Sequence, residues 1–250
     1  ANILSFNQKH LVALIALWAA EEQEPSTIAI RRSVLSVFTK VIGKGGMVPG
    51  VKDFDKLGFS SSIAKRTTVA LEDRSWTDAQ YIEASKAAHL LDYRYGHIVD
   101  VMWFLGLRGK EGYMLEPNLA DCGTHLHLTK GTKNGRPRNV PIDTPEKRQL
   151  IDRCKAVVPD VTDSISGKFR GLKETVNWYK EKNELIGATL AGKIGKQPHG
   201  LRHTFAQNEL MKRGVTVTVK GAAGIPVDAP PLNLSLIHIS EPTRLRRTSY

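Results

Sequence analysis

The stretch Gln197–Ala206, QPHGLRHTFA, begins a predicted helix with two groups that can carry positive charge. Pro198 suits the first turn, because its fixed φ is helical and its missing N–H would have no partner there. His199 and Arg202 are three residues apart and therefore share one helical face, at the partially positive end of the helix. This arrangement predicts an anion as their common target. The alternative is a surface helix with a polar start, which so short a pattern does not exclude.

The composition of the chain favours a polyanionic partner. Its 250 residues suffice for a hydrophobic core in one large or two small domains, and they carry 36 Lys and Arg against 25 Asp and Glu. The net charge of +11 is typical of proteins that bind nucleic acid or an anionic membrane surface. The longest apolar run, Leu11–Ala20, is too short to span a bilayer, and no signal peptide pattern is present. With only Cys122 and Cys154 as cysteines, we expect a cytoplasmic protein that binds double-stranded DNA and no membrane.

Residues 1–74 are predicted to form a small, basic, all-helical domain. Helical spacing of apolar residues predicts a helix around Leu11–Ala20 and another over 60–71. Between them, a helix is expected to begin after an N-cap at Ser26 and to end at the glycines of residues 43–46. The apolar stripe of this middle helix consists of Ile30, Val34, Val37, Phe38 and Val41. The predicted DNA contacts of the domain are the basic residues Arg31, Arg32, Lys40, Lys44, Lys65 and Arg66.

The rest of the chain is predicted to be helical apart from one hairpin. A capping box at Ser75–Asp78 opens a helical region, and further helices follow Pro145. Between them, residues 124–129 (THLHLT) alternate as a strand does, KNG forms a turn, and residues 136–142 (RPRNVPI) form a second strand. Prolines in the second strand limit its pairing, which indicates a short edge hairpin. The expected fold class is therefore mainly α with a small antiparallel β-sheet.

Three separated basic motifs follow one chemical logic. Arg108 comes after an apolar helix, and Glu111, three residues later, can hold its guanidinium in a constant orientation. Lys133 lies at the tip of the predicted hairpin, from which a long side chain can reach a site formed elsewhere. His199 and Arg202 supply the third motif. Together these side chains predict an electropositive clamp for one phosphodiester.

With its GLRxxE, TKxGRPRxVPI and HGLRHxFA motifs in this order, the chain resembles the tyrosine recombinases of the phage-integrase type, in particular the integrase-like proteins of integrative elements. The resemblance covers residues 1 to about 214, and the three motifs together are far more specific than any one alone. It implies a two-domain DNA clamp, with a SAM-like helical core-binding domain at residues 1–74 and a catalytic domain at residues 75–233. It also implies that the protein forms homo-oligomers on DNA.

The resemblance implies strand cleavage and rejoining through a 3′-phosphotyrosyl intermediate. Arg108 and Arg202 would hold the non-bridging oxygens of the scissile phosphate. Lys133 would protonate the departing 5′-oxygen, with Lys130 as the second candidate for this role. His199 would bond to the phosphate or assist proton transfer.

Some residues have supporting roles in this scheme, and others are excluded from it. Glu111 would orient Arg108 without touching DNA, and Arg136 and Arg138 on the second strand are predicted DNA contacts. No cofactor is expected, because the covalent intermediate conserves the bond energy. No metal site is expected either, since the sequence shows no carboxylate cluster for two metal ions. The polar residues Cys122, His125 and His127 are interpreted as an exposed strand face.

The nucleophile is left unassigned. A tyrosine-bearing motif is expected after Gly214, but residues 215–233 contain no tyrosine. Residues 234–244, LSLIHISEPTR, correspond to the translation of a sequencing-library adapter, so residues 234–250 are predicted to be non-native and Tyr250 not to be catalytic. The absence of an initiator Met likewise predicts a fragment. We therefore expect this chain to bind DNA without cleaving it.

Two other functions remain open. A non-catalytic DNA-binding accessory protein could keep the same fold and the same basic clamp. A topoisomerase that uses a tyrosine with a similar set of basic residues is a weaker enzymatic alternative. A covalent protein–DNA adduct would separate the enzymes from the accessory protein.

Overall fold

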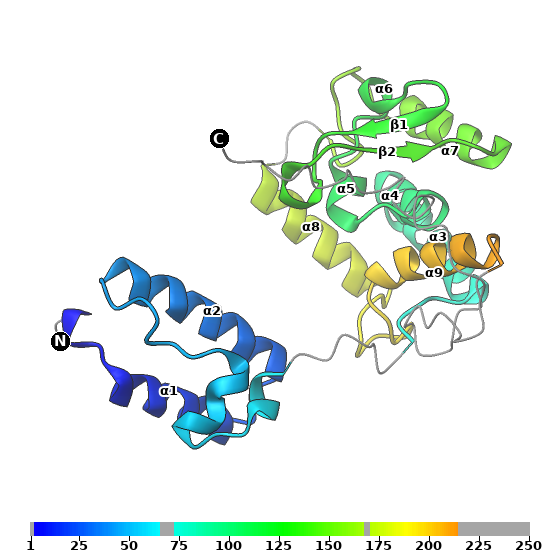
Figure 1. Cartoon of the computed structure of the whole chain (residues 1–250). Helices are drawn as coiled ribbons and strands as arrows, with labels where there is room; N and C mark the ends of the chain where they lie inside the picture. The colour runs from blue at the N-terminus through cyan, green and yellow to red at the C-terminus, as the bar shows by residue number, and fades with distance from the viewer. Residues whose placement is uncertain (1–2, 66–72, 168–170, 215–250) are drawn as a thin grey trace. The chain divides into compact units, whose positions relative to one another are not determined.

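The structure, a computed structural model, describes residues 3–65, 73–167 and 171–214. The chain divides into two compact units, Ala1–Ala70 and Leu71–Tyr250 (Figure 1). Arg66 and the predicted tail at residues 234–250, including Tyr250, lie outside the described residues. Within the described ranges, no helix is both long and apolar enough to cross a membrane.

The first unit is helical. Its elements are η1 (Ile3–Ser5), α1 (Gln8–Ala20), α2 (Pro25–Val41), η2 (Val51–Leu57) and η3 (Ser61–Ala64). Helix α1 begins with a capping box, in which Asn7 and His10 exchange side chain–backbone hydrogen bonds. The core of the unit contains Leu11, Ile15 and Phe54, all essentially inaccessible to solvent. Helices α1 and α2 therefore share one core with the apolar residues of η2 and η3.

Helix α2 differs from its prediction in two respects. It begins at Pro25 with Glu24 as N-cap, because a proline is preorganised for the first helical position, and Ser26 is already inside the helix. Four residues of its predicted stripe are more than half exposed: Ile30, Val34, Val37 and Val41. The core instead receives another face of α2, which carries Ile28 and Leu35. Helical spacing identifies an apolar face but does not say which face meets the core.

The predicted helix over residues 60–71 is wrong in its described part. Only a short 3-10 turn, Ser61–Ala64, forms there, and Lys65 already has extended backbone angles. The hydroxyl of Ser60 accepts a hydrogen bond from the backbone N–H of Ser62 and also contacts the Ser62 hydroxyl. Such local serine bonds compete with helical hydrogen bonds and favour a turn.

In the second unit, the other helices and the hairpin pack around one central helix, α4 (Figure 1). Its elements are α3 (Asp78–Leu91), α4 (Tyr93–Leu105), α5 (Gly109–Tyr113), α6 (Pro117–Ala120), β1 (His125–Leu128), η4 (Lys133–Gly135), β2 (Arg138–Pro141), α7 (Pro145–Ala156), α8 (Leu172–Leu185) and α9 (His199–Met211). Helix α4 is buried almost throughout and contacts α3, α5, α7 and α9. The predicted capping box at Ser75–Asp78 is displaced: Thr77 and Gln80 cap α3, whereas Ser75 bonds to Asp73.

The predicted hairpin is present. Strands β1 and β2 pair antiparallel in a two-stranded sheet, with Leu126 opposite Val140 and His125 opposite Pro141. Leu126 and Val140 enter the core, while His127 is exposed on the other face. The mainly helical fold with a small antiparallel sheet, expected from the sequence, is confirmed.

A glycine at the end of α4 shapes the corner on which the candidate site is built. Gly106 has a φ of +60°, in the left-handed region that favours glycine. A Cβ at this position would lie 2.1 Å from the ring of Phe205 on α9. Because Gly106 has no side chain, α9 packs directly against the turn that leads to Arg108.

Candidate active site

Arg108 stands at the corner between α4 and α5 and is held by a buried carboxylate. The side chain of Glu111 is fully buried. Its Oε2 accepts a hydrogen bond from the Arg108 backbone N–H at 2.7 Å, and its Oε1 accepts one from Arg108 Nη1 at 2.8 Å. The predicted orienting contact between Glu111 and Arg108 is therefore present in the geometry. A guanidinium bonded in this way has little freedom to leave its position.

The same carboxylate also binds Arg138 from strand β2. Arg138 donates from Nε to Oε1 of Glu111 at 3.1 Å and from Nη2 to Oε2 at 2.7 Å. Burial alone would raise the pKa of Glu111, but the bonds from Arg138 and from the Arg108 backbone outweigh it, so this pKa lies below its ordinary value. The carboxylate is ionised, and the two guanidinium groups leave an excess of positive charge. Arg138 is largely buried in this pair.

Helix α9 brings His199 and Arg202 to the same corner. Arg202 donates from Nη1 to the carbonyl oxygen of Gly106, two residues before Arg108. The pKa of His199 is lowered, first by burial and then by the positive charges of His203, Arg202 and Arg108. The His199 ring packs edge-to-face on the ring of His203, with the two ring centres 4.9 Å apart. Arg108, His199 and Arg202 are called the arginine–histidine cluster below.

The start of α9 is held in place by the segment that precedes α3. The Trp76 backbone N–H donates to Thr204 Oγ1 at 2.7 Å, and its indole Nε1 donates to the carbonyl of Gln197 at 2.9 Å. A Cβ at Gly200 would lie 2.2 Å from the carbonyl oxygen of Arg74, so only glycine admits this segment. Sequence analysis misses Trp76 and Thr204, because their contact spans more than a hundred residues of the chain. In the sequence, only Gly200 within the HGLRH motif indicates that another segment approaches the backbone closely at this position.

The hairpin packs onto α5 beside the cluster. Gly131, with a φ of +72°, lies so near α5 that a Cβ there would be 2.5 Å from the carbonyl oxygen of Lys110. Lys130 forms an ion pair with Glu116. Lys133 at the hairpin tip is exposed and forms no ion pair with any residue that the structure describes. Of the two candidate lysines, Lys133 is therefore the more available for a ligand, although the geometry does not bring it into contact with the cluster.

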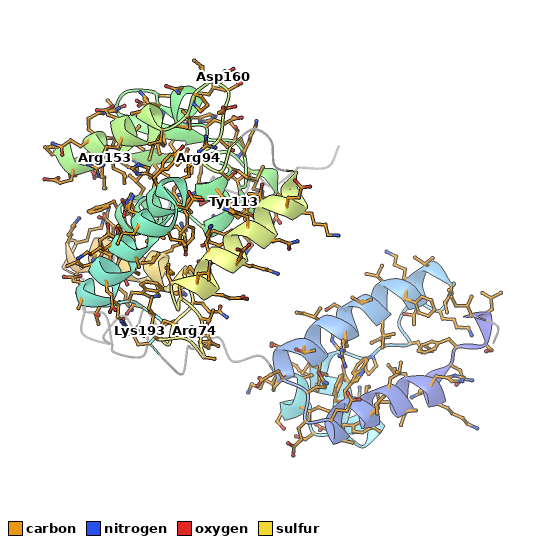
Figure 2. All side chains as sticks on the ribbon, turned by 180° about the vertical axis from the view of Figure 1, so that it is seen from behind. Arg74, Arg94, Tyr113, Arg153, Asp160 and Lys193 are labelled. Atoms are coloured by element: carbon orange, nitrogen blue, oxygen red, sulfur yellow. The ribbon has the colours of Figure 1, made fainter. Side chains whose placement is uncertain are left out.

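Two cavities border His199. One, of about 350 Å³, is lined by Gly109 and Tyr179 in addition to His199. The other, of about 260 Å³, is lined by Arg74 and Lys196 among others. Figure 2 labels Arg74 at the lower edge of the second unit, next to the label of Lys193. His199 is thus accessible at the rim of both cavities, and basic groups surround the second one.

Several predicted DNA contacts of the first unit also hold that unit together. The Arg31 guanidinium lies 5.5 Å from the centre of the Trp18 ring, and Arg32 donates from Nη1 to the carbonyl of Pro49. Lys44 donates to two backbone carbonyls of the N-terminal segment. Among the other described residues in this prediction, Lys40, Lys65 and Arg136 are exposed, whereas Arg138 is largely buried in its ion pair with Glu111. Their binding to DNA stays a prediction.

The described tyrosines do not supply an activated nucleophile. Burial is the first cause that raises the pKa of Tyr81, Tyr95, Tyr113 and Tyr179, which is the opposite of what an attacking hydroxyl needs. The hydroxyl of Tyr179 donates to the sulfur of Met102. Tyr93 is exposed, but it stands at the start of α4, the end remote from Arg108. The nucleophile is therefore not assigned to any tyrosine in the described ranges.

The residues interpreted as an exposed polar strand face behave as ordinary surface groups. His127 Nδ1 is hydrogen bonded to Asn139 Oδ1 at 2.8 Å, across the hairpin. His125 Nδ1 is hydrogen bonded to the hydroxyl of its neighbour Thr124. Cys122 is exposed and carries a free thiol. These three side chains do not assemble into a metal-ligand group in the part of the chain that the structure describes.

Comparison with solved structures identifies the fold. The chain is similar to lambda integrase bound to DNA, with a TM-score of 0.54, 15% sequence identity, and coverage of 82% of this chain and 72% of that chain. A lambda integrase tetramer bound to a Holliday junction matches with a TM-score of 0.55, 14% identity, and coverage of 92% and 69%. The Tn1549 transposon integrase in complex with circular intermediate DNA matches with a TM-score of 0.52, 14% identity, and coverage of 98% and 84%. At such identities the likeness establishes the fold alone.

Sequence comparison identifies the family. None of the curated proteins matches the chain. The family model described as integrase matches residues 64–208, which is more than half of the chain and includes Arg108, His199 and Arg202. The chain belongs to the phage integrase, or tyrosine recombinase, family, whose members bind and recombine DNA.

Proposed function

We propose that the arginine–histidine cluster holds the scissile phosphate of a DNA duplex for strand cleavage and rejoining through a 3′-phosphotyrosyl intermediate. One observation carries this proposal: Arg202 bonds to Gly106, two residues from Arg108, while Glu111 holds the Arg108 guanidinium in place. Two guanidinium groups at one corner suit the charge that develops on the non-bridging oxygens of a phosphate under attack. His199, neutral because its pKa is lowered, can accept or pass a proton there.

Lys133 is proposed as the general acid for the departing 5′-oxygen. It lies on the exposed hairpin tip, while Lys130 is already paired with Glu116. The hairpin itself is tied to the Arg108 corner by Arg138, which limits where Lys133 can reach. We assign Lys130 no role in the reaction.

We further propose that the chain acts as a homo-oligomer on double-stranded DNA, with residues 1–74 as a SAM-like DNA-binding domain and residues 75–233 as the catalytic domain. The net charge of +11 supports a polyanionic partner. Similar folds have been solved as a dimer on a core site and as a tetramer on a Holliday junction. The attacking tyrosine is proposed to be absent from this chain, and Tyr250 not to serve in its place.

The test uses a pool of random duplexes, so that the target sequence need not be known in advance. Each duplex carries a nick that lets the cleaved end diffuse away, and hydrogen peroxide is added as a small external nucleophile. Its oxygen can bond to phosphorus as the bond to the 5′-oxygen breaks and that oxygen takes up a proton. We expect no covalent adduct without peroxide, and strand cleavage with it. Arg108→Lys and Arg202→Lys should each lower the cleavage rate roughly 100-fold or more.

The control is Lys173→Gln, an exposed residue on α8 outside the cluster, which should cleave at the wild-type rate. A protein–DNA adduct without peroxide would show that a tyrosine of this chain does attack, and peptide mapping would identify it. DNA binding without cleavage under both conditions would favour the second candidate, a non-catalytic accessory protein. That candidate rests on the raised pKa of Tyr81, Tyr95, Tyr113 and Tyr179 and on the absence of an assigned nucleophile among the described residues.

A further inference from the structure

Helices α3 and α4 bring together three side chains that can ligate a metal, outside the arginine–histidine cluster. His89 comes from α3, and His97 and Asp100 come from one face of α4. One ligand atom of each lies within 4.8 Å of the other two. His89 Nε2 and Asp100 Oδ2 are hydrogen bonded at 2.8 Å, so a small increase in their separation would let both atoms bind one ion. His97 and Asp100 are buried, while His89 is partly open to solvent.

The carboxylate of Asp100 is oriented by two hydroxyl groups. Its Oδ1 accepts hydrogen bonds from Tyr81 at 2.9 Å and from Ser85 at 2.7 Å. Both donors approach the same oxygen, so Oδ2 is left facing the imidazole of His89. Outer hydrogen bonds of this kind hold a ligating carboxylate in metal sites.

The imidazole of His97 has an unsatisfied nitrogen. Its Nδ1 is buried and has no hydrogen-bond partner. The ring packs edge-to-face on His89, with the two ring centres 4.9 Å apart. A buried polar atom without a partner is unfavourable, and such an atom in a native protein calls for a ligand or another explanation.

A glycine makes room for the histidine pair. Gly96 lies inside α4, where glycine is a poor helix former. A Cβ at this position would lie 2.4 Å from the His89 ring. Glycine at position 96 is therefore what allows His89 to reach the face of α4 that carries His97 and Asp100.

We propose that His89, His97 and Asp100 form a Zn²⁺ site that ties α3 to α4. Two imidazoles and one carboxylate are a typical zinc ligand set, and they leave a fourth position for water. The solvent-exposed side of His89 gives the ion its route of entry. None of its three ligands belongs to the arginine–histidine cluster. A failed test of the metal site would therefore leave the proposed function untouched, and the reverse also holds. The ion would connect two helices that pack against each other.

Elemental analysis of the whole chain, expressed in zinc-supplemented medium with a tag that contains no histidine, tests the proposal. We expect one zinc ion per chain in the wild type, and a visible d–d absorption of tetrahedral type after growth with Co²⁺. His97→Ala should lose the bound metal. Tyr81→Phe keeps all three ligands but removes one outer hydrogen bond, so Co²⁺ affinity should fall by about 10–100-fold.

His127→Ala is the matched control, because His127 is an exposed histidine on β1, away from α3 and α4, and should not affect metal content. Wild-type protein that folds normally but takes up neither zinc nor Co²⁺ would overturn the proposal, as would equal metal content in the His97→Ala and wild-type proteins. Loss of zinc in the His127→Ala variant would also overturn it. If His97→Ala does not fold, the wild-type Co²⁺ spectrum and the Tyr81→Phe affinity decide.

Discussion

Arg138 on strand β2 donates two hydrogen bonds to Glu111, the same buried carboxylate that holds Arg108 at the start of α5. The two arginines are thirty residues apart in the chain, and a single carboxylate joins them. The hairpin and the corner that carries Arg108 are therefore connected through one side chain. This connection makes Arg138 the first residue to test.

Replacement of Arg138 by Met should lower the free energy of unfolding by roughly 3 kcal/mol, because it removes one partner from a buried ion pair. Arg108 still bonds to Glu111, so the loss should stay at the lower end of the range for such pairs. Urea unfolding followed by circular dichroism measures the change. The exposed Arg136 is the control, and Arg136→Met should change stability by less than about 0.5 kcal/mol. Equal effects of the two substitutions would argue against the shared carboxylate.

Gly106→Ala should destabilise the protein more than an alanine at another left-handed glycine. Both Gly106 and Gly135 have positive φ, but only at Gly106 would a Cβ collide with a ring, that of Phe205. Gly135→Ala should cost about 1 kcal/mol for backbone strain alone. Gly106→Ala should cost roughly 2 kcal/mol more, because overpacking adds to the strain. Thermal unfolding of the two variants gives the comparison, and similar losses would mean that α9 can move away from this corner.

Thr204→Val should destabilise the protein by about 1–3 kcal/mol, because the backbone N–H and carbonyl of the buried Trp76 lose their common partner. Thr204→Ser keeps the hydroxyl and should recover most of this loss. Denaturant unfolding of both variants measures it. Valine preserves the shape of threonine, so a Thr204→Val protein as stable as the wild type would show that the hydroxyl contributes nothing.

The titration of His199 reports on the cluster itself. Its pKa should lie below the ordinary value of 6.5, since burial and the charges of His203, Arg202 and Arg108 all disfavour the protonated form. Arg202→Gln and Arg108→Gln remove one charge each and should raise this pKa. NMR titration of the imidazole signals in each variant measures the shift. Replacement of the exposed Arg136 by Gln is the control. If the pKa of His199 is the same in the wild type and in all three variants, neither Arg108 nor Arg202 lies close enough to His199 to affect its protonation.

Binding to duplex DNA should weaken strongly with salt, because lysine and arginine contacts to phosphates release counterions. The plot of log association constant against log salt concentration should lose about one unit of slope in Lys133→Gln, if the exposed Lys133 contacts a phosphate. Arg138→Gln should leave the slope nearly unchanged, because Arg138 is engaged with Glu111. Fluorescence anisotropy at several salt concentrations provides the measurement. An unchanged slope in Lys133→Gln together with a reduced slope in Arg138→Gln would reverse these assignments.

Local patterns in the sequence were sufficient to predict the hairpin and most helices of the second unit. Strand alternation and the KNG turn act over a few residues, and the register follows from them. On α2, two apolar faces compete, and only the packing of η2 and η3 decides that Ile28 is buried while Val34 is exposed. Tertiary contacts, which no local pattern contains, settle this choice.

The same limit applies to the candidate site. The pairing of Arg108 with Glu111 could be predicted from their three-residue spacing, which in the structure is that of an N-cap residue and the third residue of α5. The second partner of Glu111 could not, since Arg138 is distant in sequence and its basic motif is equally typical of a DNA contact. Nor does the sequence reveal why Gly106 and Gly200 are glycines, because the side chains that approach them belong to other segments.

A ribbon of two short strands is barely stable in isolation, and β1 with β2 is such a ribbon. The hairpin is therefore stabilised by its contacts with α5, which are the backbone contact at Gly131 and the ion pair of Arg138 with Glu111. Opening of the hairpin would therefore break the bonds of Arg138 to Glu111, while Arg108 keeps its own bonds to the same carboxylate. We therefore expect the amide protons of β1 and β2 to exchange with solvent at the rate at which the contacts of the hairpin with α5 open.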